Sequence, residues 1–236
     1  MIEDLRSKEA DDIKREEFYF DEINSTQDYA KKLYLENHDN FIIYADSQTK
    51  GRGRNGRVWK APSRGLWFSF DMDFLDKCEL FTMAIGVLVR EVLEEIYNLK
   101  VQLKWPNDLI LDRKKVGGII CEKVKNKVIV GVGINTNIDK IEEEKATTFF
   151  NKTGKLVDNY EVMNYIISRC EDVSKLDKNI IIERFRKNMA YRGEICYVSV
   201  INENVKIVDV SDTGGLIVET SNGIKEVFAG EINVCI

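Results

Sequence analysis

The residue types best suited to chemistry lie together in one short stretch, Gly51–Arg57, with the sequence Gly-Arg-Gly-Arg-Asn-Gly-Arg. Glycine permits sharp turns, positive φ angles and a close approach of the backbone to a ligand. Arginine carries a permanent charge on a planar group whose N–H donors match phosphate and carboxylate. The stretch predicts a mobile loop that closes on an anion, with a solvated basic surface turn as the alternative.

Two other glycine motifs fit the same letters, and residues later in the chain distinguish them. A dinucleotide fingerprint requires a helix directly after the glycines, whereas Pro62 and Gly65 disfavour a helix over 58–65. This argues against a nicotinamide-dependent oxidoreductase. A protein kinase would carry V-A-I-K, H-R-D and D-F-G further along the chain, and none of these occurs.

Composition narrows the function classes further. The 236 residues include 40 acidic and 35 basic side chains, and the formal net charge of −5 disfavours a general nucleic-acid binder. We expect a cytoplasmic protein without a membrane span or signal peptide. The five cysteines form no C-x-x-C pair, which predicts reduced thiols and no zinc site. The only histidine, His38, lies in a polar segment, which disfavours histidine-based catalysis.

The positioning elements are predicted from apolar spacing. We expect a polar N-terminal arm at 1–17, an α+β catalytic domain at 18–190 and a small β-barrel of five short strands at 191–236. Within the larger domain, strands are expected at 18–20, 41–45, 66–72, 101–104, 109–111, 116–124 and 128–134. Helices are expected near 26–34, 79–97, 162–173 and 181–189.

Other polar groups lie at the ends of these strands. Ser25 and Thr26 precede a helix and serve either as a cap alone or as a cap that also holds a polar ligand. Lys104–Asp108 (Lys-Trp-Pro-Asn-Asp) follows a strand. Four glycines punctuate the hairpin over 116–134, which indicates either bulges and turn ends or close approach of a ligand or another backbone: Gly117, Gly118, Gly131 and Gly133.

Taken together, the motifs resemble those of biotin protein ligases. The similarity rests on Asn24–Gln27, Gln48–Trp59, Lys104–Leu109, Lys115–Ile119 and Gly131–Asn135, whose order and spacing match that family over about residues 18–137. The small C-terminal domain, with Phe228–Ile232 (Phe-Ala-Gly-Glu-Ile) near its end, also fits. The resemblance implies a fold like that of class II aminoacyl-tRNA synthetases, followed by an SH3-like barrel.

The resemblance also implies a reaction in two steps. Biotin and ATP form biotinyl-5′-adenylate and pyrophosphate, and a lysine of a biotin carboxyl carrier protein then accepts the biotinyl group. The expected cofactors are ATP, biotin and Mg²⁺. A homodimer is also expected, with the apolar strand over 128–134 as a candidate surface. About 17 residues precede Phe18, so a DNA-binding domain is not expected.

Residue roles are carried over as hypotheses. Arg54 and Lys104 would be catalytic, with Lys104 beside the mixed anhydride and Arg52 and Arg54 on the biotin carboxylate and α-phosphate. Arg57 would reach toward the triphosphate, Trp59 would close over the adenylate, and Asn135 would contact the nucleotide. Asp108 would bind Mg²⁺ or serve as a turn acid. Ser25, Thr26 and Gln48 would bind the fused ring of biotin, and the remaining site residues would be Gln27, Gly51, Gly53, Asn107, Gly117, Gly118, Gly131 and Gly133.

Two departures from the family pattern and two alternatives accompany this assignment. Gln27 stands where the family's S-T-N motif has asparagine, and Asn233–Ile236 provides no arginine near the C-terminus. A lipoate–protein ligase would share the fold and chemistry with a different acyl group. A non-catalytic nucleotide- or RNA-binding module on the same core is disfavoured by the acidic charge balance.

Overall fold

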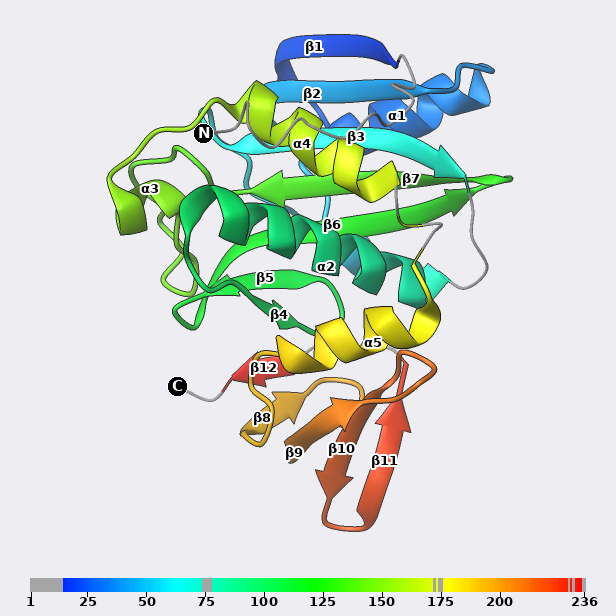
Figure 1. Cartoon of the computed structure of the whole chain (residues 1–236), viewed down its shortest axis with the longest axis vertical. Coiled ribbons are helices and arrows are strands. Elements are labelled where there is room, and N and C mark those ends of the chain that lie inside the picture. The colour runs from blue at the N-terminus through cyan, green and yellow to red at the C-terminus, as the bar shows by residue number, and fades with distance from the viewer. Residues whose placement is uncertain are drawn as a thin grey trace.

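The computed structural model describes residues 15–73, 78–171, 173, 176–228, 230 and 232–234. Residues 1–14 of the predicted arm lie outside this range, as do residues 229, 231, 235 and 236 from the C-terminal motifs. The described chain forms a large mixed sheet with helices on both faces and a small antiparallel sheet beneath it (Figure 1).

The large sheet has seven strands in the order β1-β2-β3-β7-β6-β5-β4. β1 runs parallel to β2, and the other neighbouring pairs are antiparallel. The parallel pair is possible because a helix crosses between its two strands. The strands are β1 (Glu16–Ile23), β2 (Phe41–Gln48), β3 (Leu66–Asp73), β4 (Gln102–Lys104), β5 (Asp108–Leu111), β6 (Lys114–Val124) and β7 (Lys127–Ile134).

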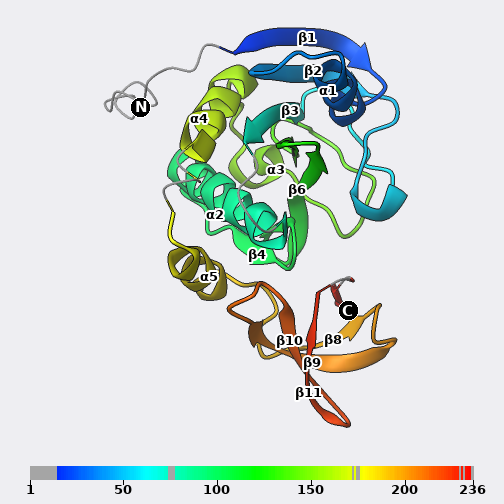
Figure 2. The same ribbon diagram turned by 90° about the vertical axis from the view of Figure 1, so that its right-hand side faces the viewer.

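The helices divide between the two faces of this sheet. α1 (Thr26–Leu35) packs on β2, β3 and β7, while α2 (Cys78–Tyr97) and α4 (Asn159–Glu171) lie on the opposite face (Figure 2). The short α3 (Phe149–Thr153) follows β7, and α5 (Lys178–Lys187) lies between the large sheet and the small one (Figure 1). α2 contacts the sheet, α4 and α5, which explains why its sequence is apolar on nearly all sides.

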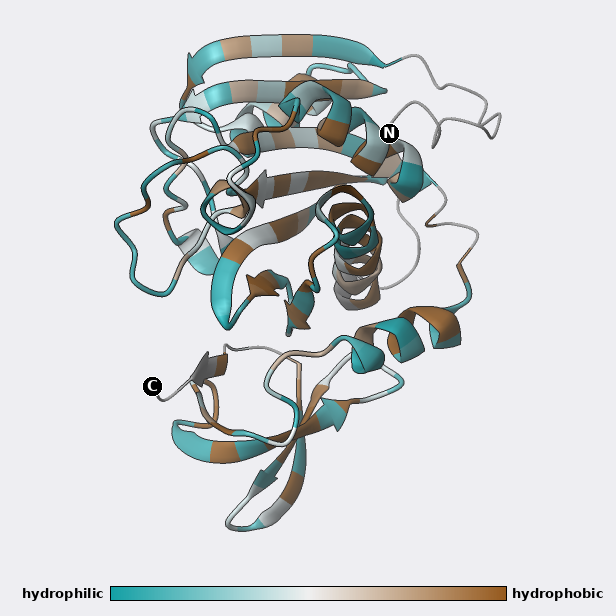
Figure 3. Cartoon of the chain, turned by 60° about the vertical axis from the view of Figure 1, so that its left-hand side comes forward, coloured by the Kyte–Doolittle hydropathy of each residue, from teal (hydrophilic) through white to brown (hydrophobic). Residues whose placement is uncertain are grey.

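Alternation along the strands separates a core face from a second face. On β7, Val128, Val130, Val132 and Ile134 belong to the main core with α2, whereas Ile129 joins a second cluster under α1. Successive side chains of a strand point to opposite faces, so Gly131 and Gly133 lie on the α1 face. Hydrophobic and hydrophilic bands alternate along the strands in Figure 3. The α1 face is therefore the one on which glycine leaves room for a ligand.

The small sheet contains the five strands expected in the C-terminal region, in the order β11-β10-β9-β8-β12. They are β8 (Ile195–Val198), β9 (Glu203–Val210), β10 (Leu216–Thr220), β11 (Gly223–Val227) and β12 (Ile232–Val234). Closure would require β11 to pair with β12. In the described residues β11 pairs with β10 and β12 pairs with β8, so the expectation of a closed barrel is corrected to an open sheet.

Several element boundaries differ from those predicted. β1 starts at Glu16, and β6 starts at Lys114, within the segment expected to be a turn; α3 had no predicted counterpart. β7 is hydrogen-bonded to β3 on one side and to β6 on the other. The strand over 128–134 therefore has no free edge for pairing with a second chain. No helix in the described ranges is long and apolar enough to cross a membrane.

Candidate active site

A cavity of about 340 Å³ lies on the α1 face of the large sheet, beneath the loop that comes after β2. Its walls come from the start of α1, the loop over 52–60, β3, the β4–β5 turn, β6, β7, the segment around 141–146 and β12. Residues far apart in sequence therefore meet in one place because β3, β7 and β6 are neighbours in the sheet.

The floor of the cavity is built from glycines on the adjacent strands β6 and β7. A Cβ atom on Gly131 would lie 2.6 Å from Gln27 Oε1 and 2.7 Å from Ile120 Cγ2. A Cβ on Gly133 would lie 3.1 Å from the Trp59 indole, and one on Gly118 would lie 3.3 Å from the same ring. Glycine is therefore needed where side chains approach the strands closely, whereas the sequence predicted the approach of a ligand or another backbone.

One end of the cavity carries uncharged hydrogen-bonding groups. Thr26 begins α1, and its N–H and hydroxyl donate to Gln48 Oε1 at 2.8 and 3.2 Å. Thr26 Oγ1 is also 2.9 Å from Ser69 Oγ on β3, and Ser69 donates to Gln27 Oε1 at 3.1 Å. Thr26, Gln27 and Ser69 are all buried. A ligand group with both donors and acceptors fits such a cluster.

The loop over the cavity is a small hairpin of its own. Trp59 N–H donates to Gly51 O at 2.8 Å, and Gly53 N–H donates to Arg57 O at 2.8 Å. A Cβ on Gly51 would lie 2.5 Å from Trp59 O, so the paired backbone requires glycine there. Asn55 at the tip has φ 56°, which asparagine tolerates better than most residues.

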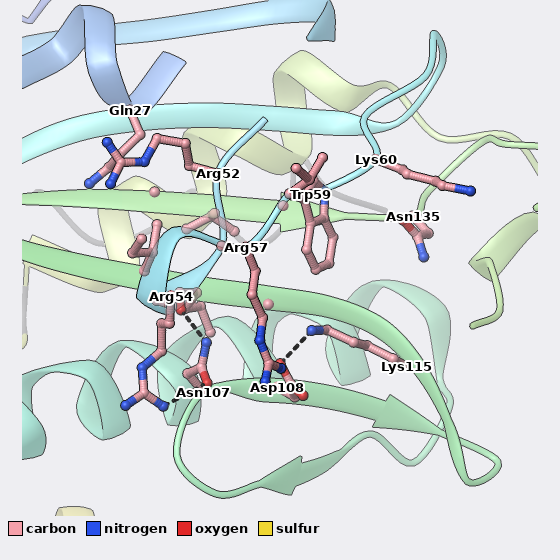
Figure 4. Close-up of a pocket in the computed structure, with 18 of the residues that line it drawn as sticks. Gln27, Arg52, Arg54, Arg57, Trp59, Lys60, Asn107, Asp108, Lys115 and Asn135 are labelled. Carbon is pink, nitrogen blue, oxygen red and sulfur yellow. Dashed lines mark hydrogen bonds and ion pairs between the residues drawn. The ribbon is translucent and has the colours of Figure 1, made fainter. Parts of the chain in front are cut away.

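The three arginines of this hairpin point to two different places, as Figure 4 shows. Arg52 extends toward Gln27, and its guanidinium is 2.6 Å from Asp28 Oδ1 on α1. Arg54 and Arg57 extend toward Asn107 and Asp108 at the β4–β5 turn, and Arg54 donates to Asn107 Oδ1 at 3.3 Å. The structure therefore brings Arg54 and Arg57 together and directs Arg52 elsewhere.

Burial lowers the pKa of Arg54 below its ordinary value, a nearby Asp108 opposes that shift, and Arg57 adds to it. The hydrogen bond from Arg54 to Asn107 is to a neutral oxygen. A partly desolvated guanidinium gains from an anionic ligand, so this end of the cavity suits phosphate.

Two lysines flank a single buried carboxylate at the same end. Asp108 Oδ2 is 2.7 Å from Lys104 Nζ, and Asp108 Oδ1 is 2.7 Å from Lys115 Nζ. Burial raises the pKa of Asp108, but Lys104 and Lys115 outweigh burial and hold that pKa below its ordinary value. Asp108 is thus ionised at neutral pH and fixes both ammonium groups at the cavity wall.

These contacts do not fit the Mg²⁺ role expected for Asp108. Both of its carboxylate oxygens are within 2.7 Å of a lysine nitrogen, and a cation would be repelled by the two ammonium groups. The described part of the chain holds no group of three or more His, Cys, Asp or Glu side chains arranged for a metal ion. Asp108 instead begins β5, directly after the β4–β5 turn, and pairs with two lysines.

Trp59 forms the side of the cavity between the two ends. Lys115 Nζ lies 4.8 Å from the centroid of the Trp59 ring. The Trp59 and Trp67 rings pack edge to face, with their centroids 6.1 Å apart. Trp59 Nε1 is buried and has no hydrogen-bond partner among the residues that the structure describes. A buried donor left unpaired is unfavourable, so an acceptor on a bound ligand would stabilise this indole.

The small C-terminal sheet also reaches the cavity. Ile232 of β12 lines it, and Lys104 Nζ donates to Ile232 O at 3.5 Å. The neighbouring Trp105 is buried and its Nε1 donates to Gly214 O at 3.0 Å. Two hydrogen bonds to backbone carbonyls thus join the Lys104–Trp105 segment to the C-terminal region.

Most residues predicted to form the site line this cavity, namely Thr26, Gln27, Gln48, Arg52, Gly53, Arg54, Arg57, Trp59, Lys104, Asn107, Asp108, Gly118, Gly131, Gly133 and Asn135. Three others lie behind it. Ser25 caps α1 by accepting from Asp28 N–H at 3.2 Å, Gly51 pairs with Trp59, and a Cβ on Gly117 would lie 2.8 Å from Gly133 O. Asn135 is buried and donates to Thr147 O at 2.9 Å.

Sequence reasoning missed Ser69 and Lys115 as site residues. Ser69 is fully buried in a strand of large apolar residues, and a lone buried hydroxyl in such a run is a usable signal. Lys115 comes after two other basic residues, and that basic run predicts a turn. Because successive side chains of a strand point to opposite faces, Lys115 lies on the other face of β6 from Lys114, which is exposed.

Comparisons with known proteins agree with this arrangement. The model of the "Biotin/lipoate A/B protein ligase family" matches residues 19–139, and that of the "Biotin protein ligase C terminal domain" matches residues 194–234. The Bifunctional ligase/repressor BirA of Bacillus subtilis is 30% identical, covering 92% of this chain and 73% of that protein.

A solved structure is also similar throughout. The biotin protein ligase from Aquifex aeolicus in complex with biotin and ATP superposes with a TM-score of 0.82 at 35% identity, covering 93% of this chain and 98% of that one. The chain therefore belongs to the biotin/lipoate A/B protein ligase family, among its biotin protein ligases.

Proposed function

We propose that the protein is a biotin–protein ligase that activates biotin with ATP and transfers it to a lysine of a biotin carboxyl carrier protein. One observation carries the proposal: the cavity joins a neutral hydrogen-bonding end, Thr26, Gln48 and Ser69, to a cationic end that includes Arg54 and Lys115. The Aquifex relative that superposes over most of the chain holds biotin and ATP.

The first half-reaction joins two anions. A carboxylate oxygen of biotin attacks the α-phosphorus of ATP, the bond from that phosphorus to the bridging oxygen breaks, and pyrophosphate leaves. Fixed cations offset the repulsion between the reactants and stabilise the charge that develops. Arg54, Arg57, Lys104 and Lys115 line the cavity and would supply this charge, while Trp59 would cover the adenylate.

The second half-reaction needs no covalent enzyme intermediate. The amine of the acceptor lysine attacks the biotinyl carbonyl, AMP leaves with the bonding electron pair, and the new amide nitrogen loses a proton. The mixed anhydride is already activated, so binding and orientation provide most of the catalysis. A histidine base is therefore not required, and none lines the cavity among the described residues.

The neutral hydrogen-bonding end of the cavity favours biotin over lipoate. A ureido ring has two N–H donors and a carbonyl acceptor, and it would use the hydroxyl and amide groups around Thr26 and Ser69. The dithiolane ring of lipoate has no N–H donor and no carbonyl acceptor to offer to those groups. A site built for hydrogen bonds rejects a ligand that lacks them.

Several finer features belong to the same proposal. We assign residues 18–190 to a catalytic domain that resembles class II aminoacyl-tRNA synthetases, and residues 191–236 to a domain related to SH3-like folds. Because Asp108 is paired with two lysines, Mg²⁺ would be held by the phosphates of ATP. A cytoplasmic location and a homodimer are further parts of the proposal, supported by the family resemblance.

The decisive assay is ATP–pyrophosphate exchange. Exchange should require biotin and should not be supported by lipoate. The Lys104→Ala variant should lose exchange while still folding, as judged by a cooperative melting transition, and Lys100→Ala, which removes a nearby exposed lysine, should retain exchange. Exchange in the absence of biotin, or equal exchange with lipoate, would contradict the proposed function.

A further inference from the structure

Arg52 is held by carboxylates from two separate elements. Its Nη1 is 2.6 Å from Asp28 Oδ1 in the first turn of α1, and its Nη2 is 3.5 Å from Glu122 Oε1 on β6. Arg52 itself belongs to the hairpin that covers the cavity, where its backbone pairs with that of Val58 in antiparallel fashion. One side chain thus links the cover of the cavity to a helix and to a strand.

The two carboxylates are themselves fixed by other groups. Lys31 Nζ lies 3.3 Å from Asp28 Oδ1 and 3.1 Å from Glu122 Oε2. Gln27 Nε2 donates to Glu122 Oε2 at 3.0 Å and to Ile129 O at 3.1 Å. Two cations therefore face two anions, and the cluster is balanced without an added ligand. A carboxylate from a substrate would have to displace one of these partners to reach Arg52.

The cluster of Arg52, Asp28, Glu122 and Lys31 also contacts the neutral hydrogen-bonding end of the cavity through Gln27. Gln27 donates to Glu122 with its amide nitrogen and accepts from Ser69 with its amide oxygen. The same side chain therefore connects the carboxylate that holds Arg52 to the hydroxyl group beside the acyl ligand. This contact places Glu122 where it fixes both the hairpin and the pocket.

We propose that Asp28 and Glu122 are positioning residues, and that Arg52 anchors the hairpin to α1 and β6 instead of binding the substrate carboxylate. The inference rests on the proposed function and differs from the role that the resemblance implies for Arg52. Arg54 and Arg57 point to the opposite end of the cavity (Figure 4) and are the arginines placed to meet phosphate. The anchor holds one end of the hairpin while its tip closes on the adenylate.

The expected effect is moderate because these groups are partly exposed, with exposed fractions of 34% for the Arg52 side chain, 49% for Asp28 and 28% for Glu122. Each solvent-exposed ion pair contributes little to the free energy of the folded state. A loop that exchanges between open and closed positions nevertheless responds to a small bias, since the populations shift with the difference between the two states. We expect a change of about three- to tenfold in adenylate release.

A charge swap tests the anchor. Asp28→Arg and Arg52→Asp are made singly and together, and the rate at which biotinyl-adenylate leaves the enzyme is measured with the KM for biotin and the kcat of exchange. Each single variant should release adenylate about three- to tenfold faster. The double variant should recover part of the loss, because the reversed pair is restored but still lies beside Glu122 and Lys31. The Michaelis constant for biotin should change less than the release rate.

Two isosteric variants test the same contacts with less risk of misfolding. A control variant tests whether the location of the removed carboxylate matters. Asp28→Asn and Glu122→Gln should show the same direction of change with unaltered melting transitions. Glu36→Gln removes a carboxylate from the end of the same helix, paired with Lys32 at 3.8 Å, and should leave release unchanged.

If Arg52 binds the substrate carboxylate, Asp28→Asn will have no effect on release and the swap will not recover activity, which overturns the anchor. The proposed function fails separately, when wild-type protein shows no biotin-dependent exchange.

Discussion

The floor and the cover of the cavity are built in different ways. The floor consists of the paired strands β6 and β7, whose backbone hydrogen bonds hold them in a continuous register, and its glycines leave space where Gln27 and Trp59 approach. The cover is a hairpin with a short 3₁₀ turn at Arg54–Gly56 and a residue at positive φ in its tip. Backbone hydrogen bonds close its base, whereas side-chain contacts such as Arg52 with Asp28 tie it to α1.

This difference assigns distinct tasks to the two regions. A rigid strand holds hydrogen-bonding groups in a fixed geometry and so determines which acyl group fits. A hairpin that is anchored at one end can open for substrate and close over the adenylate. Changes in the floor should therefore alter the affinity for biotin, and changes in the cover should alter retention of the intermediate.

The largest effect is expected from Gly131→Ala in the floor. The added methyl would lie 2.6 Å from Gln27 Oε1 and 2.7 Å from Ile120 Cγ2, and Gln27 is held by three hydrogen bonds. Crowding in a packed site of this kind raises the free energy by up to about 3 kcal/mol. We expect the KM for biotin to rise about 100-fold, measured by exchange, with a smaller change in the KM for ATP.

Gly86→Ala is the matched control for this substitution. Gly86 lies in α2, where a Cβ would make ordinary contacts of 3.5 Å with Leu103 and 3.7 Å with Ile119. Alanine also favours helix, so this variant should keep its KM for biotin. If Gly131→Ala binds biotin like the wild type, the floor does not define the acyl pocket.

The glycines of the floor show how far the sequence alone reaches. The strands over 116–124 and 128–134 and their hairpin were predicted correctly, since apolar runs and turn residues encode them locally. At Gly131 the sequence predicted the approach of a ligand or another backbone, and the structure places the side chains of Gln27 and Ile120 there. The face on which these glycines lie depends on α1 and β3 packing against the hairpin, and such long-range contacts leave no local signal.

The charged residues were harder to interpret from sequence. The composition of Gly51–Arg57 predicts an anion-binding segment, but it gives no sign that Arg52 pairs with Asp28, which lies on another element. Lys115 lies in a basic segment that predicts a turn, so the sequence did not indicate it as a site residue. A metal role for Asp108 fitted the sequence, and the structure shows that the Asp108 carboxylate pairs with two lysines. Residue type gives the chemistry, whereas the choice of partner is decided by the folded chain.

A second prediction concerns Asp108, where the cover meets the β4–β5 turn. Asp108→Asn leaves Lys104 and Lys115 facing each other without their shared counter-charge. Removal of one member of a buried ionic group is destabilising, and we expect a loss of about 2 kcal/mol in the free energy of unfolding at pH 7. Denaturant unfolding of wild type and variant at several pH values measures it.

The pH dependence has a defined sign. The pKa of Asp108 is lower in the folded protein than its ordinary value, so the stabilisation is present above the unfolded-state pKa and is lost as pH falls through the folded-state pKa. The difference between variant and wild type should therefore shrink below about pH 4. Glu161→Gln, at an acidic residue in the first turn of α4, is a suitable control. A difference that stays constant with pH would show that Asp108 acts through packing and not through charge.

The smallest expected effect is in the cover, at Arg54. Arg54→Gly removes a partly buried cation whose hydrogen bond is to a neutral oxygen of Asn107, so stability should change little. Adenylate should escape several-fold faster, because one cation facing the phosphate is lost; this is an expected change of about 1 kcal/mol. Escape is measured as biotinylation of lysines on a bystander protein.

The variant also adds a flexible residue to the hairpin, and a matched substitution separates that change from the loss of charge. Asn55→Gly replaces a residue already at φ 56°, so glycine fits its conformation while every arginine is kept. If the charge of Arg54 retains the intermediate, Asn55→Gly should leak far less than Arg54→Gly. If both variants release adenylate equally fast, the rigidity of the hairpin, and not the charge of Arg54, retains the intermediate. The tip of the hairpin would then have no separate role for its charge.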